Sequence, residues 1–272
     1  MGSGEWGWIV PDGLWEVVEP LLPAARVRQQ GGGTANLDDR AVFAAVVYVL
    51  TTGCAWRHLP PCFGVSKSTV HRRFTIWTKD GLWGRLRRVM LERLADAEVL
   101  DLSRVVVDSV HVRAKKGGEH TGPSPIDRGK PGSKVHVLSD CNGLPLVIGI
   151  SSADTHDQHG LTPLVEALPA KHDPERAPHL LPRKLHADKA YDNSELRTWL
   201  RRRGILPRIA RKGVESSQTL GRHRWVIERT MSWLTGYRRI ARRYERDHRH
   251  YLAFCDLAAV ITCHKRLAKT TT

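Results

Sequence analysis

A long apolar run and a secretion signal are both missing from the 272-residue sequence. The most apolar stretch, residues 41–50, is far short of the roughly 20 residues that a membrane span requires, so we expect a buried helix there. Residues 1–6 do not combine a basic segment with a following apolar one, which argues against secretion. We therefore expect a cytoplasmic protein without a membrane partner.

Cysteine is scarce, with five residues and no C-x-x-C pair. An odd number of unpaired cysteines is typical of reduced thiols in a cytosolic protein. Cys255 and the neighbouring Cys263 and His264 are poor candidates for a metal site, because no second pair completes a tetrahedral ligand set.

Acidic residues are too few to balance the basic ones. Lysine and arginine number 43 against 28 acidic residues, which gives a formal net charge of +15. Such a balance favours a polyanionic partner, with nucleic acid as the first candidate and an anionic membrane surface as the second. The length and the 41% hydrophobic content allow one large domain or two modest ones.

The first hundred residues predict a helical region. Residues 11–23 are typical of a short amphipathic helix bounded by prolines, and Asn36 is a possible cap for a buried helix that ends at Gly53. Ser66 is the expected cap of a further helix with an apolar inner stripe, made of Val70, Phe74 and Trp77.

The outward residues of this further helix are polar or basic. They are Lys67, Ser68, His71, Arg72 and Arg73. In a helix-turn-helix, residues at these places contact base edges and phosphates, so we predict that they bind DNA. The alternative is a helical bundle whose basic face is only solvated.

Beyond residue 102 the pattern changes to that of strands. Residues 104–112 are apolar and β-branched up to Asp108, which predicts a central strand with an acid in it. Residues 134–139 and 145–150 flank an Asn-Gly pair, a strong hairpin signal, so three antiparallel strands are expected. Residues 115–133, rich in Gly, Lys and Pro, are predicted to form a mobile basic loop.

Two further strands are predicted nearer the carboxyl terminus. Residues 184–188 form a short strand that ends in Asp188, and Asn193 caps the helix that follows. Residues 205–209 form an edge strand, where Pro207 is tolerated. The element order predicts an α/β (α+β) fold, namely an RNase-H-like mixed sheet flanked by helices over residues 99–272. A helical, helix-turn-helix-like domain precedes it over residues 1–98.

Two acidic segments need separate interpretation. Residues 154–159 hold several potential metal ligands, but Asp157 is more simply the N-cap of the helix after it. Glu228 lies on a predicted helix beside Arg224 and Arg229, where a surface ion-pair lattice is the ordinary explanation. The alternative is that Glu228 joins Asp108 and Asp188 in one site.

Several short motifs occur in the same order as in a known family. They are GCAWRHLP (53–60), STVHRRF (68–74), VDS (107–109), GSKVH (132–136), THD (155–157), ADKAYD (187–192) and RWVIERT (224–230). Through them the chain resembles the DDE transposases of small bacterial insertion sequences, in the insertion-sequence-five group of the insertion-element-4-type transposases. The resemblance runs from about residue 14 to residue 264, and the combination is more specific than any single motif.

The resemblance implies a transposase that cuts DNA at the ends of its element and joins them to a target. It implies a catalytic triad of Asp108, Asp188 and Glu228, and end binding by the first hundred residues. Two Mg²⁺ ions, about 3.5–4 Å apart, would activate the nucleophile and stabilise the leaving oxygen, with Mn²⁺ as a substitute. Asp108 would bridge them, Asp188 would bind one and Glu228 the other, while Arg224 and Arg229 would hold phosphate.

The partners implied are double-stranded DNA, as terminal inverted repeats and as target, and a second copy in a homodimeric synaptic complex within the nucleoid. Some relatives carry a Tyr and a Lys or Arg near the glutamate where this chain has Gly221 and Thr235. Their contacts are not carried over, and Arg238 or Arg239 is the expected replacement. A structure-selective nuclease or resolvase of the same fold, and a catalytically silent DNA-binding derivative, remain alternatives.

Overall fold

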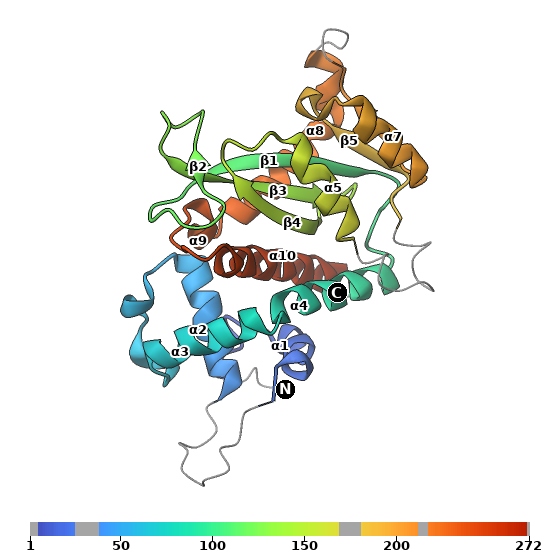
Figure 1. Ribbon diagram of the computed structural model, residues 1–272. Coiled ribbons are helices and arrows are strands. Elements are labelled where there is room, and N and C mark those ends of the chain that lie inside the picture. Colours follow the sequence, from blue (N-terminus) through green and yellow to red (C-terminus); the bar gives the residue numbers. More distant parts are fainter. Residues whose placement is uncertain (1–4, 25–37, 169–180, 212–216, 271–272) are drawn as a thin grey trace.

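The computed structural model describes residues 5–24, 38–168, 181–211 and 217–270, and the side chains of the helix that begins at residue 217 are described from Trp225 onward. A group of helices formed by the first hundred residues lies below a mixed sheet, and the last long helix, α10 (His248–Thr270), lies between them (Figure 1). No helix in these ranges is long and apolar enough to cross a bilayer.

Three of the amino-terminal helices are those that the sequence predicts, namely α1 (Asp12–Val18), α2 (Asp39–Thr52) and α3 (Lys67–Lys79). The structure adds α4 (Leu82–Asp96) and the 3₁₀ turns η1 (Glu19–Leu21), η2 (Trp56–His58) and η3 (Pro61–Phe63). Ser66 caps α3 and Gly53, at φ 70°, ends α2, as predicted. The Asn36 cap is wrong, because Asp38 holds that place and accepts the Arg40 N–H.

The central sheet has the strand order of an RNase-H-like fold. Its strands are β1 (Val105–Arg113), β2 (Gly122–Pro123), β3 (Pro131–Ser139), β4 (Pro145–Ser152), β5 (Lys184–Ala187) and β6 (Leu206–Ile209). β3 pairs antiparallel with β1 on one side and with β4 on the other. On the far side of β1, β5 pairs in parallel with β1, and β6 pairs in parallel with β5. β6, which holds Pro207, is at the edge of the sheet as expected.

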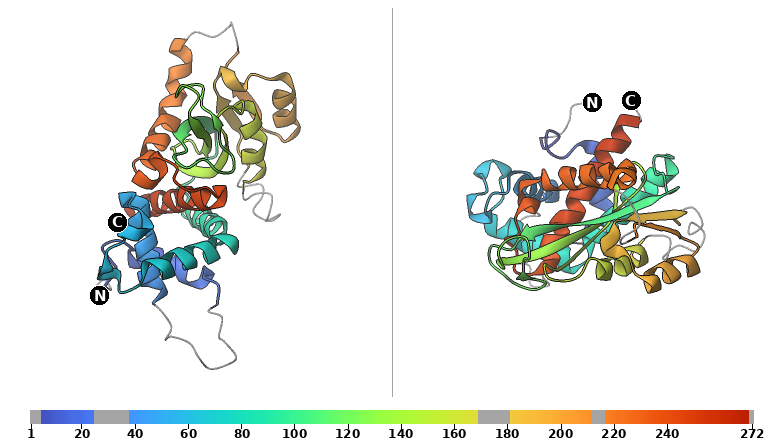
Figure 2. Two further views of the ribbon diagram at one scale, coloured as in Figure 1. Left: turned by 60° about the vertical axis from the view of Figure 1, so that its left-hand side comes forward. Right: turned by 90° about the horizontal axis from the view of Figure 1, so that it is seen from above.

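Helices cover both faces of this sheet. α5 (Gln158–Glu166) and α7 (Ser194–Arg202) lie on one face, while α8 (Ser217–Thr235), α9 (Arg238–Ala241) and α10 lie on the other (Figure 2). α8 packs on β1 and β3, and α10 packs on β4. A side chain of β1 that points to the second face therefore points toward α8.

The helix α10 joins the helical region to the sheet. Phe254 of α10 stacks on Phe74 of α3, with ring centroids 4.7 Å apart. Asp256 of α10 forms an ion pair with Arg87 of α4 at 3.0 Å, and Arg87 also donates to the Leu146 carbonyl of β4 at 2.5 Å. The buried apolar residues of both regions form one continuous core, so the two-domain division at residues 98 and 99 stays a prediction.

The expectation of a mobile loop over residues 115–133 is wrong for the described structure. Arg243 is fully buried and donates to the His120 carbonyl and to the Ser133 hydroxyl. The backbone of Lys115 donates to the Arg243 carbonyl at 2.8 Å. β2 and the beginning of β3 also lie within this segment, so it is fastened to the sheet and to the segment between α9 and α10.

Candidate active site

Asp108 and Asp188 lie at neighbouring positions on adjacent parallel strands. β1 pairs with β5 so that Val106 lies opposite His186, and two more residues along each chain lead to Asp108 and Asp188. Adjacent strands are about 4.8 Å apart, and residues in register point to the same face. Asp188 is still in extended backbone, at φ −77° and ψ −179°, although β5 ends one residue earlier. The structure therefore brings these two predicted residues together.

Both aspartates are half-buried, and each accepts one local backbone hydrogen bond. Asp108 Oδ1 accepts from the Ser109 N–H at 2.8 Å, and Asp188 Oδ1 accepts from the Ala190 N–H at 2.8 Å. An ionised carboxylate accepts contacts through two oxygens, which have about four lone-pair sites in all. Two neighbouring carboxylates are an oxygen-rich donor set of the kind that Mg²⁺ prefers.

The side chain of Asp108 points to the face of the sheet that α8 covers. The next residue, Ser109, donates its hydroxyl to Asp157 at the start of α5, at 2.6 Å, so Ser109 faces α5. Successive side chains of a strand point to opposite faces. Asp108 therefore points toward the face of the sheet that α8 covers. In Figure 2 this face lies opposite the one that carries α5.

Glu228 lies on α8, with its side chain exposed. Val226 and Thr230 pack on the turn at Gly143, where the Thr230 hydroxyl donates to the Gly143 carbonyl at 2.7 Å. Each is two residues from Glu228, about 200° around the helix, so Glu228 extends from the opposite side of α8.

The side of α8 toward this turn is its buried side, where Val226, Ile227 and Thr230 lie. Glu228 therefore lies on the exposed side of the helix. No hydrogen bond or ion pair of Glu228 is found in the described ranges. The triad of Asp108, Asp188 and Glu228 therefore stays a prediction.

The two arginines beside Glu228 differ in what the structure describes. Arg229 is held between the exposed rings of Trp225 and Trp233, at 4.6 and 4.8 Å from the ring centroids, and donates to the Asn142 carbonyl at 2.6 Å. The expected ion pair of Arg229 with Glu228 is thus not formed. Arg224 lies on α8, but its side chain is outside the described part.

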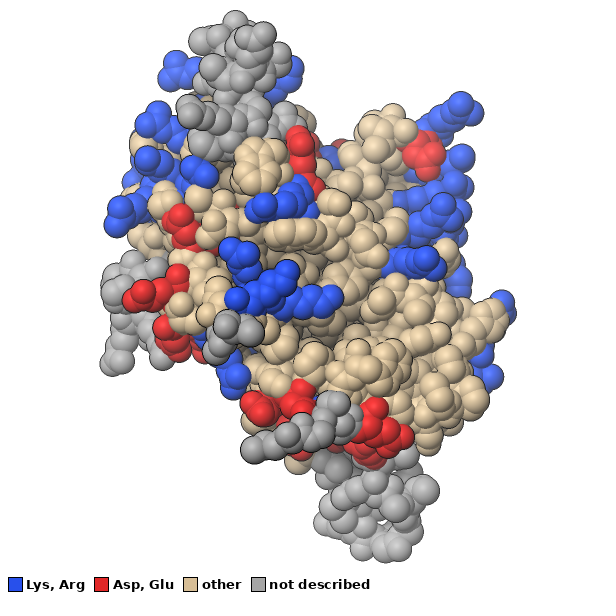
Figure 3. Space-filling model, turned by 180° about the vertical axis from the view of Figure 1, so that it is seen from behind, with Lys and Arg blue, Asp and Glu red and all other residues tan. Residues whose placement is uncertain are grey.

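A pocket that sequence reasoning missed lies at the end of this aromatic row. Its volume is about 460 Å³, and α2, α8 and α10 each contribute to its wall. Trp233 and Tyr237 line it, together with the cations Lys265, Arg266 and Lys269, and acidic residues are absent from the lining. Basic side chains gather in the middle of the face that Figure 3 shows. The sequence signal was the cluster of cations near the end of α10.

The predicted DNA-binding residues of α3 do not all remain available. Lys67, Ser68, His71 and Arg72 are exposed. His71 also packs edge-on against Trp56, with ring centroids 5.2 Å apart, and partial burial followed by the nearby Arg239 lowers its pKa. Arg73 turns inward, where it forms an ion pair with Asp39 of α2 and stacks on Trp77.

Of Arg238 and Arg239, the expected replacements, only Arg238 is exposed. Arg239 is buried, where it pairs with Glu245 at 2.6 Å and donates to the Cys54 carbonyl at 2.9 Å. The expectation that Arg239 reaches substrate is therefore wrong, because these two contacts already use its guanidinium.

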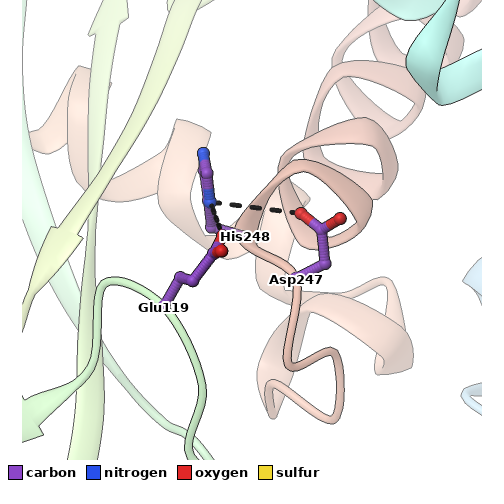
Figure 4. Close-up of side chains that lie close together, drawn as sticks. All are labelled: Glu119, Asp247 and His248. Atoms are coloured by element: carbon purple, nitrogen blue, oxygen red, sulfur yellow. Dashed lines mark hydrogen bonds and ion pairs between the residues drawn. The ribbon is translucent and has the colours of Figure 1, made fainter.

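A second group of possible metal ligands lies apart from the aspartates. Glu119 approaches His248 Nδ1 at 2.5 Å from the segment after β1, with Asp247 beside them (Figure 4). Asp247 already accepts two side-chain hydrogen bonds from Arg249, at 2.8 and 3.0 Å. These bonds are the main reason that the pKa of Asp247 is lowered to about 2. This group is explained as an ion-pair cluster that fastens residues 115–121 to α10.

Two family models match the chain. Residues 10–87 match one described as "Putative transposase of IS4/5 family", and residues 100–263 match one described as "Transposase DDE domain". A "Putative transposase for insertion sequence element IS402" of Burkholderia cepacia is 39% identical over 166 residues, which are 61% of this chain and 77% of that protein. An "Insertion element IS402 uncharacterized 16.2 kDa protein" of the same organism is 37% identical over 43% of this chain and 81% of its own length.

Solved structures of Mos1 complexes are similar at a distance. A pre-cleavage Mos1 transpososome is 13% identical, with a TM-score of 0.29 over 90% of this chain and 82% of the other. The Mos1 mariner paired end complex with Mn is 12% identical, with a TM-score of 0.26 over the same shares. Values this low do not support a conclusion about fold or function.

Proposed function

The chain belongs to the DDE-domain transposases of the IS4/5 type, and from this premise we propose that it cuts DNA at the ends of an insertion sequence and joins them to a target. We further propose that Asp108, Asp188 and Glu228 carry the reaction, with residues 1–98 as a domain that binds the ends. The site of action would be the cytoplasm, on the nucleoid, with a homodimer holding two ends.

The observation that carries the proposal is the β1–β5 register, in which Asp108 and Asp188 each lie two residues beyond the pair Val106 and His186. A transposase needs carboxylates at the place where the scissile phosphate is held. The parallel pairing of β1 and β5 holds the two chain segments side by side up to these residues, so little reorganisation is needed when substrate binds. Glu228, on α8, would supply the third carboxylate.

Asp108, Asp188 and Glu228 would hold two divalent cations, with Mg²⁺ favoured by an all-oxygen donor set. When bound, such cations generate the hydroxyl nucleophile and stabilise the leaving oxygen of an in-line displacement. The chain's own part is to keep its carboxylates oriented. The hydrogen bonds from the Ser109 and Ala190 N–H groups restrict the rotation of the Asp108 and Asp188 side chains.

The DNA path would follow the α8 face. The row of Trp225, Arg229 and Trp233 and the basic pocket beyond it present rings and cations without intervening acids. Lys67, Ser68, His71 and Arg72 on the exposed side of α3 offer a second polar and basic surface for the element end. Two separate surfaces suit a protein that must hold an element end in register while the proposed carboxylates cut the DNA.

Incubation of the purified chain with a labelled inverted-repeat end, target plasmid and Mg²⁺ tests the proposal. Nicking at the element boundary followed by joining to the plasmid is the expected result. Cutting without joining would instead identify a structure-selective nuclease or resolvase. End binding without any cutting would identify a catalytically silent DNA-binding derivative, and omission of the metal should stop cutting without preventing binding.

A further inference from the structure

A buried polar network lies on the α5 face of the sheet, directly behind Asp108. Asp157 Oδ1, at the beginning of α5, accepts the Ser109 hydroxyl at 2.6 Å and pairs with Lys134 Nζ of β3 at 3.0 Å. Lys134 Nζ also donates to the Thr155 carbonyl at 2.6 Å. The Lys134 side chain is only 7% exposed, so this pair is largely removed from water.

Asp157 does not act as the helix cap that the sequence predicts. It occupies the N-cap position of α5, but its backbone is helical and its side chain makes no capping hydrogen bond. The carboxylate instead turns to β1 and β3, because Ser109 and Lys134 offer a hydroxyl and an ammonium there. A local cap has thus given way to a contact with two strands.

The turn that follows Asp188 packs on α5, the helix at whose beginning Asp157 lies. Asp188 caps this 3₁₀ turn, η5 (Lys189–Tyr191), and the ring of Tyr191 at its end is buried. Burial, followed by the negative charges of Asp157, Asp108 and Asp188, raises the pKa of its hydroxyl, which keeps it neutral. Tyr191 therefore lies within electrostatic reach of all three carboxylates.

We propose that Asp157, with Lys134 and Ser109, is a positioning residue that fixes the backbone at Asp108 and the adjoining turn at Asp188. The inference deepens the proposed function and rests on it. Ser109 is covalently next to Asp108, so a hydrogen bond that holds the Ser109 side chain on one face also fixes the direction of Asp108 on the other. An ion pair that is largely removed from water contributes little net stability compared with apolar residues, and here it orients the strand that carries Asp108.

The experiment compares Asp157→Asn and Ser109→Ala with Ser109→Thr, which keeps the hydroxyl, and with the control Asp154→Asn. Asp154 belongs to the same motif, but it is exposed, and its hydrogen bond joins it to Ser152. Two readouts are taken well below the unfolding temperature. They are single-turnover cleavage at saturating DNA and Mg²⁺, and amide hydrogen exchange of the segments 105–112 and 188–192.

Asp157→Asn and Ser109→Ala should lower the cleavage rate roughly ten- to a hundred-fold, which is the loss expected when a reacting group is displaced by about 1 Å. Binding of the element end by these variants should be unchanged. Their exchange in both segments should be faster, while Ser109→Thr and Asp154→Asn should resemble the wild type in both readouts. Unchanged exchange in Asp157→Asn and Ser109→Ala would overturn the proposal, and so would wild-type cleavage by both. If the wild type itself does not cut, the proposed function fails, and the exchange data still decide whether the network fixes these segments.

Discussion

At the scale of single residues, local chemistry identified most helix boundaries. Ser66 and Asn193 cap their helices as predicted, because side-chain acceptors at an N-cap satisfy nearby N–H groups without help from the fold. Asp157 was misread for the opposite reason. Its partners, Ser109 and Lys134, come from distant parts of the chain, and a sequence pattern does not show which of two acceptor roles is used.

His136 provides a prediction at this scale. Burial lowers the pKa of His136 to about 4, with Lys134 and His111 also lowering it and Asp157 opposing them. The unfolded chain takes up the proton near pH 6.5, so stability that is present above pH 6.5 is lost as the pH falls toward 4. At 1.36 kcal/mol per pKa unit, about 2 kcal/mol should be lost between pH 7.5 and 5.

The measurement is urea unfolding of the wild type and of His136→Gln at both pH values. Glutamine can keep the hydrogen bond to Ser151, which His136 makes at 2.8 Å, but it does not titrate. The stability advantage of the wild type should therefore shrink by about 2 kcal/mol at pH 5. A constant difference between the two proteins would show that His136 titrates normally in the folded state.

At the scale of elements, periodicity predicted the strands well and the loop poorly. The apolar run before Asp108 and the Asn-Gly turn depend on neighbouring residues, and the structure confirms both. The segment 115–133 has the composition of a mobile loop, but a buried Arg243 from the far end of the chain fastens it. The inward direction of Arg73 likewise depends on Asp39, which the pattern of α3 alone does not reveal.

The pocket between α8 and α10 gives a prediction for these elements. If it holds DNA phosphate, the double variant Lys265→Gln, Lys269→Gln should bind an element end more weakly at every salt concentration. The slope of log K against log salt should fall in magnitude by about two, roughly one for each lost contact.

The matched control is Arg183→Gln, Lys184→Gln, two exposed cations at the beginning of β5, the end opposite Asp188. Its slope should remain close to that of the wild type. An equal change of slope in both double variants would mean that only net charge matters, and that the pocket has no special part in binding.

At the scale of the whole molecule, α10 makes the helical region and the sheet dependent on each other. Asp256 is buried and pairs with Arg87, which opposes the rise in the Asp256 pKa that burial causes. The sequence around Arg87 does not reveal this partner, because Asp256 lies far along the chain. The order of motifs did predict the fold, because strand and helix order restricts the possible topologies.

Arg87→Met should lower the free energy of unfolding by about 3–5 kcal/mol, because it leaves the Asp256 carboxylate buried without its cation. The double variant Arg87→Met, Asp256→Leu removes both charges and should recover most of this loss. Urea unfolding followed by tryptophan fluorescence measures both effects. A double variant as unstable as the single one would show that the ion pair itself, and not the uncompensated charge, accounts for the loss.

The central claim is that Glu228 acts together with Asp108 and Asp188, and single-turnover cleavage by Glu228→Gln tests it most directly. With Mg²⁺ and a labelled inverted-repeat end, Glu228→Gln should lose roughly a thousand-fold or more in rate, about 4 kcal/mol of transition-state stabilisation. Asp188→Asn should behave alike, and both should bind the end as the wild type does. Cleavage by Glu228→Gln at the wild-type rate would contradict the account, leaving Glu228 as a surface residue of α8.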